Sequence, residues 1–251
     1  MRLGNAINSG RSTEDAMYVV TFCRRGLRLF LVATWCAIAL CPAPPGHAAL
    51  PDGFVYVAEA VPDVLLEIRY YGTYNFVGAR VDGYKAPVAV LSVEAAASLR
   101  RAAEIATARG YVLKVFDAYR PQAAVDHFVR WAGDMRDAKY KAVFYPQVDK
   151  TKLFELRYIA EKSGHSRGST VDITLIDRLS GRECDMGSPF DFFGPISHHG
   201  TDLITPKQAD NRAILQSIMQ ESGFKPYAEE WWHYTLDNEP YPDTYFTFEV
   251  R

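Results

Sequence analysis

Two short segments carry the residues with the clearest chemical potential, because each combines a histidine with a carboxylate. In the first, SGHSRGSTVD over residues 163–172, a glycine-containing loop presents His165 and a strand then presents Asp172. In the second, EWWH over residues 230–233, Glu230 lies three residues before His233. Two histidines, one carboxylate and an open position for water make a catalytic Zn²⁺ site. The remaining carboxylate, near the metal but not bound to it, would be the general base.

The spacing of the second segment sets a condition on the local structure. Successive side chains of a strand point to opposite faces, so residues 230 and 233 do not share a face of a regular strand. A bend or bulge would let both side chains reach one site. The neighbouring pair His198 and His199 is expected to support the site rather than to bind metal, because three protein ligands already complete a catalytic zinc site.

The elements that must position these residues follow from the spacing of apolar side chains and from helix signals. The predicted helices cover residues 92–109, a segment that begins at Pro121, and a segment from Thr205–Pro206 to Gly223. The predicted strands cover residues 111–116, 171–175 and 230–235, and the second of them has one polar face. Helices and strands are mixed without strict alternation. This order favours an α+β fold, a single domain in which helices pack around a mainly antiparallel sheet that carries the zinc site.

Composition excludes several classes of protein. The 251 residues include 28 basic and 30 acidic side chains, so the net charge of −2 argues against binding nucleic acid through bulk positive charge. Apolar residues make up 48% of the chain, which argues against an intrinsically disordered protein. The composition is that of a globular domain with a core of its own.

The first 49 residues have the parts of a secretory signal. A basic stretch at residues 24–28 precedes an apolar run at residues 29–41, and a segment rich in proline and small residues ends at Ala48–Ala49. We therefore expect a leader over residues 1–49, a domain over residues 50–251, and export to the periplasm. The apolar run is short for a membrane span, so no stable membrane association is expected after cleavage. An uncleaved N-terminal anchor and a start at Met17 remain alternatives.

The cysteines agree with this division. Three of the four, Cys23, Cys36 and Cys41, lie within the predicted leader, and Cys184 alone lies in the domain. The domain therefore forms no internal disulfide and must be stabilised by its apolar core.

The two histidine segments also carry a resemblance. SGHSRGSTVD and EWWHY resemble the zinc-peptidase pattern of the D-alanyl-D-alanine dipeptidases of the vancomycin-resistance type. The resemblance continues in the family's order over nearly the whole of residues 50–251. It includes GARVDGY (78–84), FDAYRP (116–121), MGSPFDFF (186–193), SHH (197–199) and EPYPDTYFTF (239–248).

The resemblance implies roles for five residues at the centre of the site. His165, Asp172 and His233 look like the ligands of one Zn²⁺ per chain. Glu230 looks like the catalytic base, which takes a proton from the attacking water. Arg120 looks like the residue that stabilises the oxyanion of the tetrahedral intermediate.

Two more residues are implied to bind the ends of the substrate. Asp191 looks like the anchor for its ammonium group, and Ser163 looks like a partner of its carboxylate. The chain departs from the familiar pattern at Ala118, where Gly is common, and at Thr170–Val171, where Ala-Ile is common. These departures affect only fine geometry, whereas the leader is unusual for the family and bears on the physiological role.

The function expected from this resemblance is zinc-dependent hydrolysis of the dipeptide D-Ala-D-Ala to two D-alanines, in turnover or recycling of cell-wall peptides. The expected partner is this small D,D-dipeptide, with no nucleic acid. An exported D,D-carboxypeptidase or endopeptidase acting on peptidoglycan stem peptides is the first alternative, and an open groove would favour it. A non-catalytic protein that binds wall fragments is the second, and Glu230 and Arg120 argue against it because binding alone requires neither.

Overall fold

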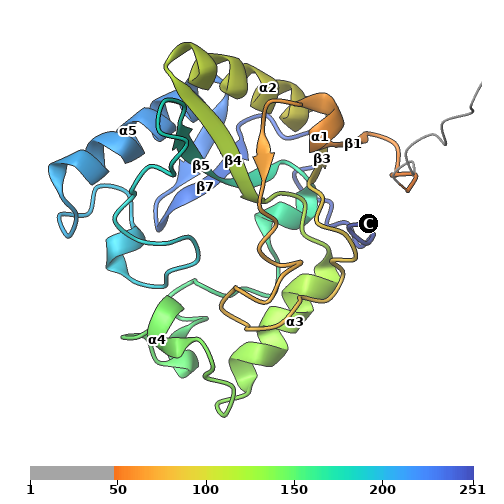
Figure 1. The fold of residues 1–251 in the computed structure, drawn as a ribbon. Helices are drawn as coiled ribbons and strands as arrows, with labels where there is room; N and C mark the ends of the chain where they lie inside the picture. Colours follow the sequence, from red (N-terminus) through yellow and green to blue (C-terminus); the bar gives the residue numbers. More distant parts are fainter. Residues whose placement is uncertain (1–47) are drawn as a thin grey trace, which may run out of the picture. The chain divides into compact units, whose positions relative to one another are not determined.

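The computed structural model describes residues 48–251, which are drawn in colour in Figure 1. The predicted leader lies outside the described residues except for its last two positions, so the division at residue 49 stays a prediction. Within the described part, no helix is long and apolar enough to cross a membrane. Cys184 is the single cysteine of residues 48–251, and its thiol is free.

A five-stranded sheet forms the centre of the fold, with β5 (Thr170–Asp177) as its middle strand. Only the β2–β4 pair is parallel, and the other three pairs are antiparallel. The strand order is β2 (Leu65–Leu66), β4 (Tyr111–Asp117), β5 (Thr170–Asp177), β7 (Glu230–Leu236) and β6 (Phe224–Tyr227). A separate antiparallel pair is formed by β1 (Phe54–Tyr56) and β3 (Val90–Ser92). The predicted α+β fold with a mainly antiparallel sheet is confirmed.

Two long helices pack against this sheet, and other helices lie away from it. Helix α2 (Val93–Ala108) packs against β4, and α5 (Pro206–Glu221) packs against β6. Figure 1 shows α3 and α4 at the other end of the domain, away from α2 and α5. The α-helices are α1 (Val57–Ala60), α2 (Val93–Ala108), α3 (Gln122–Gly133), α4 (Lys141–Phe144) and α5 (Pro206–Glu221), and the 3₁₀ turns are η1 (Lys150–Lys152), η2 (Gly164–Arg167) and η3 (Pro195–Ser197).

The long helices begin where local chemistry predicts. The Ser92 hydroxyl caps α2 by accepting a hydrogen bond from the Ala95 amide. Thr205 and Gln208 form a reciprocal capping box at the start of α5. Pro121 lies one residue before α3 as its N-cap, rather than as its first helical residue. The three predicted helices are therefore present, with boundaries shifted by one or two residues.

The three predicted strands are also present, each extended by one to three residues. The polar face of β5 is buried, because β5 lies between β4 and β7 in the middle of the sheet. Asp172 is 1% exposed and Thr174 is fully buried. A carboxylate at such a depth requires a charged partner. Neighbours that can fill this role include His165 and His233.

Candidate active site

Three elements bring the metal-ligand candidates together. Asp172 on β5 and His233 on β7 are register partners across antiparallel strands, so their side chains lie on the same face of the sheet. The 3₁₀ turn η2 carries His165, and Gly168 ends this turn in the left-handed conformation with a φ of 82°. A Cβ atom at Gly168 would lie 2.4 Å from the ring of Phe54, so the turn into β5 requires glycine on steric and conformational grounds.

The three donor atoms form a nearly equilateral triangle. The Asp172 Oδ1 atom lies 3.3 Å from His165 Nε2 and 3.2 Å from His233 Nδ1, and the two nitrogens are 3.3 Å apart. Ligand atoms bound about 2.0–2.1 Å from a tetrahedral zinc ion lie about 3.3–3.4 Å from one another. The spacing of this triangle therefore fits a tetrahedral metal ion with three protein ligands.

The hydrogen bonding of His165 supports the same interpretation. Its Nδ1 lies 2.7 Å from the carbonyl oxygen of Ala118. A carbonyl only accepts, so Nδ1 carries the hydrogen and the Nε2 lone pair points to the triangle. The buried Asp172 Oδ1 atom accepts no hydrogen bond of good geometry in the described structure, and it faces the two histidine nitrogens of the triangle. Lone pairs of two side chains thus converge on a buried point, an arrangement that a cation at this point stabilises.

The contacts within the triangle shift the pKa values of Asp172 and His233. Burial by itself would raise the pKa of Asp172, but the contacts with His165 and His233 outweigh burial and lower it. Burial lowers the pKa of His233, but the contacts with Asp172 and Glu230 outweigh it and raise the pKa to about 9. Without metal, His233 therefore carries a proton at neutral pH, and metal binding must release this proton.

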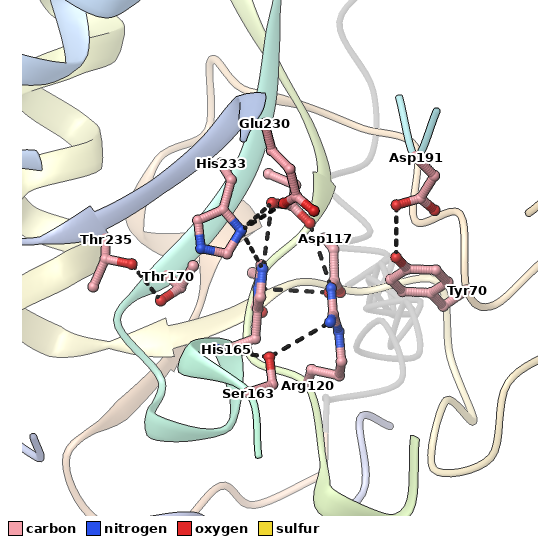
Figure 2. Close-up of polar contacts among 12 residues, drawn as sticks. Tyr70, Asp117, Arg120, Ser163, His165, Thr170, Asp191, Glu230, His233 and Thr235 are labelled. Carbon is pink, nitrogen blue, oxygen red and sulfur yellow. Dashed lines mark hydrogen bonds and ion pairs between the residues drawn. The ribbon is translucent and has the colours of Figure 1, made fainter. Parts of the chain in front are cut away.

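Glu230 reaches the triangle through an irregularity in the sheet. Pro226 pairs with Tyr234, but the next residue, Tyr227, pairs with Glu230, so β7 has extra residues at this point. The Glu230 Oε2 atom lies 3.3 Å from His233 Nδ1. The bend or bulge that the three-residue spacing required is present. Figure 2 shows the Glu230 carboxylate beside the His233 ring, where it can exchange a proton with a bound molecule.

Arg120 lies on the other side of the site. Its guanidinium lies beside the rings of Tyr70 and Phe128, at 5.0 and 5.2 Å from their centroids, and these two rings contact each other. Its Nη2 atom lies 3.5 Å from Asp172 Oδ2, and its Nη1 atom lies 3.5 Å from the Ser163 hydroxyl. A delocalised cation beside the metal triangle can stabilise negative charge that develops there.

Asp191 lines the same cavity and is held by Tyr70. The Tyr70 hydroxyl donates a hydrogen bond of 3.0 Å to Asp191 Oδ1, and the buried Oδ2 atom has no hydrogen-bond partner in the described structure. Asp191 adopts a φ of 65°, a conformation that is uncommon for residues other than glycine. Burial raises the pKa of Asp191, and the charge of Asp172 adds to this shift. The free oxygen makes Asp191 an acceptor for a cationic or donor group.

The second predicted substrate residue, Ser163, has a structural partner as well. Its hydroxyl accepts a hydrogen bond of 3.3 Å from the amide of His165, as the cap of η2. It also lines the cavity, where it faces Arg120 (Figure 2). Ser163 can therefore orient the histidine turn and present its hydroxyl to a ligand at the same time.

All seven predicted site residues line one cavity of about 240 Å³. Pockets for drug-sized ligands measure about 300–1,000 Å³, so this cavity suits a smaller molecule. Aromatic side chains form much of its wall, including Tyr70, Phe76, Phe128, Phe193 and Trp232. The structure thus brings the predicted residues together, and their individual chemical roles remain predictions.

Sequence reasoning missed two residues that hold the site. Tyr70 contacts both Arg120 and Asp191, and Asp117 forms an ion pair of 2.9 Å with Arg120. Asp117 belongs to the FDAYRP segment, which offered a signal, whereas no local pattern singled out Tyr70. His198 and His199 lie outside the group of potential metal ligands, and burial lowers the pKa of His199 to about 4.

Comparison with known proteins decides the family. The sequence pattern of the family described as D-ala-D-ala dipeptidase matches residues 51–251. The chain belongs to this family. The resemblance predicted from SGHSRGSTVD and EWWHY is therefore confirmed, and the chain is an enzyme of the peptidase class.

Relatives from three bacteria share this membership in the D-ala-D-ala dipeptidase family. The D-alanyl-D-alanine dipeptidase of Enterococcus faecium is 43% identical over 199 residues, which are 79% of this chain and 98% of that protein. The protein of the same name from Streptomyces coelicolor is 44% identical over 78% of this chain and 98% of its own length. The Escherichia coli protein of that name is 32% identical over 72% of this chain and 83% of its own.

One solved structure shows a weaker likeness. The vancomycin-resistance D,D-pentapeptidase VanY, crystallised with Zn(II), aligns with a TM-score of 0.37 and 15% identity. The alignment covers 62% of this chain and 77% of that chain. This likeness is too slight to bear on the fold or the chemistry of the present chain.

Proposed function

We propose that this chain hydrolyses D-Ala-D-Ala to two D-alanines with one zinc ion bound by His165, Asp172 and His233. The observation that carries the proposal is the triangle of donor atoms 3.2–3.3 Å apart, with the carboxylate of Glu230 beside it. Membership in the D-ala-D-ala dipeptidase family gives the substrate class. A Zn²⁺ ion in this triangle would supply Lewis acidity, which polarises a carbonyl and makes water nucleophilic at neutral pH.

Glu230 moves the proton in this reaction. Its carboxylate accepts a proton from the attacking water, and the oxygen of that water forms a bond to the carbon of the peptide carbonyl. The same carboxyl group then donates the proton to the leaving amine as the C–N bond breaks. Glu230 is ionised again at the end, so one water molecule is consumed and two amino acids are formed.

Arg120 acts on the charge that this attack creates. The carbonyl oxygen becomes an oxyanion in the tetrahedral intermediate, and the guanidinium lies beside the Asp172 carboxylate at the edge of the site. Removing one such donor from an oxyanion site costs about 3–4 kcal/mol of transition-state stabilisation. The contacts of the Arg120 guanidinium with the rings of Tyr70 and Phe128 hold it in place before substrate binds.

Two further residues distinguish a free dipeptide from a longer chain. The unpaired Oδ2 oxygen of Asp191 accepts from the ammonium group, and the Ser163 hydroxyl donates to the carboxylate. A cavity of about 240 Å³ leaves little room beyond a small dipeptide. A longer peptide lacks one of the two charged ends at the position where this site would bind it.

We also propose that the protein is exported to the periplasm, where it acts on dipeptide released in cell-wall turnover. The basic, apolar and small-residue order of residues 24–49 supports export. Mass spectrometry of the protein recovered from a periplasmic fraction tests this proposal. A mature chain that begins at or near Leu50 is expected, and an intact N-terminus on protein retained in the cytoplasm would contradict it.

The activity is tested by incubating the zinc-loaded protein with D-Ala-D-Ala, L-Ala-L-Ala and a pentapeptide that ends in D-Ala-D-Ala. Release of alanine from the free D,D-dipeptide alone is the expected result. Cleavage of the pentapeptide would identify a D,D-carboxypeptidase instead. Binding of zinc and dipeptide with no turnover would identify a binding protein.

A further inference from the structure

Two buried polar side chains at the site have no part in the mechanism above. Tyr84 ends the GARVDGY segment and Asp117 stands in the FDAYRP segment, and each is only 1% exposed. A carboxylate at this depth is costly unless charged or hydrogen-bonding groups surround it. The groups that surround Asp117 are therefore informative about its purpose.

Asp117 divides its two oxygens between the Arg120 guanidinium and the Tyr84 phenol, and its Oδ2 atom also lies 3.6 Å from Nδ1 of His165. Its Oδ2 atom accepts a hydrogen bond of 2.9 Å from Arg120 Nε and lies 2.9 Å from Arg120 Nη2. Its Oδ1 atom accepts a hydrogen bond of 2.5 Å from the Tyr84 hydroxyl. Figure 2 shows Asp117 directly beside the Arg120 head. Two contacts to one side of a planar guanidinium fix both its position and its plane.

A second carboxylate competes for the same guanidinium. Asp172 Oδ2 lies 3.5 Å from Arg120 Nη2, and Asp172 also belongs to the metal triangle. If Asp117 did not hold the Nε side, the arginine head would be free to close onto Asp172. Its remaining N–H groups would then point at a metal ligand instead of the cavity.

The backbone around Tyr84 is held by the chain segment around Val250. Val250, next to the end of the chain, bridges to Tyr84, and its amide donates a hydrogen bond of 2.9 Å to the Gly83 carbonyl. Gly83 has a φ of 84°, and a Cβ atom there would lie 2.5 Å from Pro121 Cγ. This close approach packs the turn that carries Tyr84 against Pro121, the residue that follows Arg120. The phenol therefore reaches Asp117 from a fixed support.

We propose that Tyr84 and Asp117 are positioning residues that hold the Arg120 guanidinium in the orientation required by the oxyanion. Tyr84 orients the Asp117 carboxylate, and Asp117 orients Arg120, so both act through the arginine and not on the substrate. This inference rests on the proposed function, because it needs Arg120 to stabilise the transition state.

The test compares Tyr84→Phe, Arg120→Lys and the double variant. Tyr84→Phe removes one hydroxyl and keeps the ring, and we expect it to lower kcat about tenfold with KM changed less than about twofold. Zinc content is expected to stay at one per chain. Inhibition by a phosphinate analogue of D-Ala-D-Ala, which mimics the tetrahedral intermediate, is expected to weaken by the same factor as kcat/KM. In the Arg120→Lys background, Tyr84→Phe is expected to have little further effect, because residues that act through one group are not additive.

A matched control is available one position before Arg120. Tyr119 is equally buried, but its hydroxyl donates a hydrogen bond of 2.8 Å to the Phe248 carbonyl and not to the Asp117–Arg120 pair. Tyr119→Phe therefore loses a partly buried hydrogen bond without disturbing the guanidinium, and its kcat is expected to stay near that of the unmodified protein. A further variant, Asp117→Asn, removes the charge that holds the guanidinium, and it is expected to lower kcat more than Tyr84→Phe does.

Three results would overturn the inference. The first is an unchanged kcat in Tyr84→Phe, and the second is an equal loss of kcat from this change in the presence and absence of Arg120. The third is a loss of kcat in Tyr119→Phe as large as that in Tyr84→Phe. Failure of the proposed function is seen separately, as full activity of Arg120→Lys or as no turnover of D-Ala-D-Ala by the unmodified protein, and either result also removes the inference.

Discussion

Asp172 and His233 face each other as register partners on β5 and β7, with the carboxylate oxygen 3.2 Å from the imidazole Nδ1. The next register pair on the same face of the sheet is Thr170 and Thr235, and their hydroxyls form a hydrogen bond of 2.9 Å. The sheet thereby sets the separation of two metal-ligand candidates before any metal binds, which is the preorganisation that a catalytic metal site requires. His165 completes the triangle from a turn and not from the sheet.

Glu230→Gln is predicted to abolish turnover and to leave zinc bound. The amide keeps the size of the side chain but accepts no proton from water, and general base catalysis contributes about 10²–10⁴-fold. Alanine release and zinc content are measured on the same sample. Activity above about a tenth of the original would contradict the role of Glu230 as the base.

His165→Ala is predicted to remove zinc, since it deletes one corner of the donor triangle. His127→Ala is the matched control, because the contacts of His127 are with Asp82, whose amide donates a hydrogen bond of 3.1 Å to Nδ1 and whose carboxylate lies 3.5 Å from it, and His127 does not line the cavity. Zinc is measured by atomic absorption after dialysis. One zinc ion per chain in His165→Ala would disprove the ligand set, and loss of zinc in both variants would indicate a general effect of removing a histidine.

Zinc affinity is predicted to rise with pH up to about 9. The pKa of His233 is raised to about 9, so below that pH the proton on Nδ1 competes with the metal. Each unit of pH below the pKa is expected to weaken the apparent affinity about tenfold for this one proton. Competition with a zinc-binding dye at pH 6, 7 and 8 measures the slope, and an affinity independent of pH would contradict the protonation of His233.

Asp191→Asn is predicted to remove the preference for a free amino terminus. The variant keeps an oxygen for the Tyr70 hydroxyl but loses the charge that faces the cavity. Rates on D-Ala-D-Ala and on its N-acetyl derivative are compared in both proteins. We expect the unmodified protein to favour the free amine by about 10²-fold or more and the variant to lose most of this ratio, since a missing hydrogen-bonding partner in a polar site costs much of the rate. An unchanged ratio would assign ammonium binding to another residue.

Local sequence patterns were sufficient for the long elements, and together with the family resemblance they named seven residues that line one cavity. The helix over residues 92–109 follows from its apolar stripe and its Ser92 cap, which act within a few residues of one another. The bulge in β7 follows from the three-residue spacing of Glu230 and His233, because only an irregular strand brings both to one site. The short strands β1, β2, β3 and β6 were not predicted, because they form through pairing with partners and carry little local pattern.

What the sequence by itself determined is which residue types could bind a metal, supply a base and stabilise an oxyanion. The tertiary structure alone decided which groups hold them in place. Tyr70 reaches Asp191 across 121 positions of the chain, and Tyr84 reaches Asp117 across 33. Such contacts depend on how the sheet, the turns and the tail pack together, and packing is a property of many residues at once that no local spacing records.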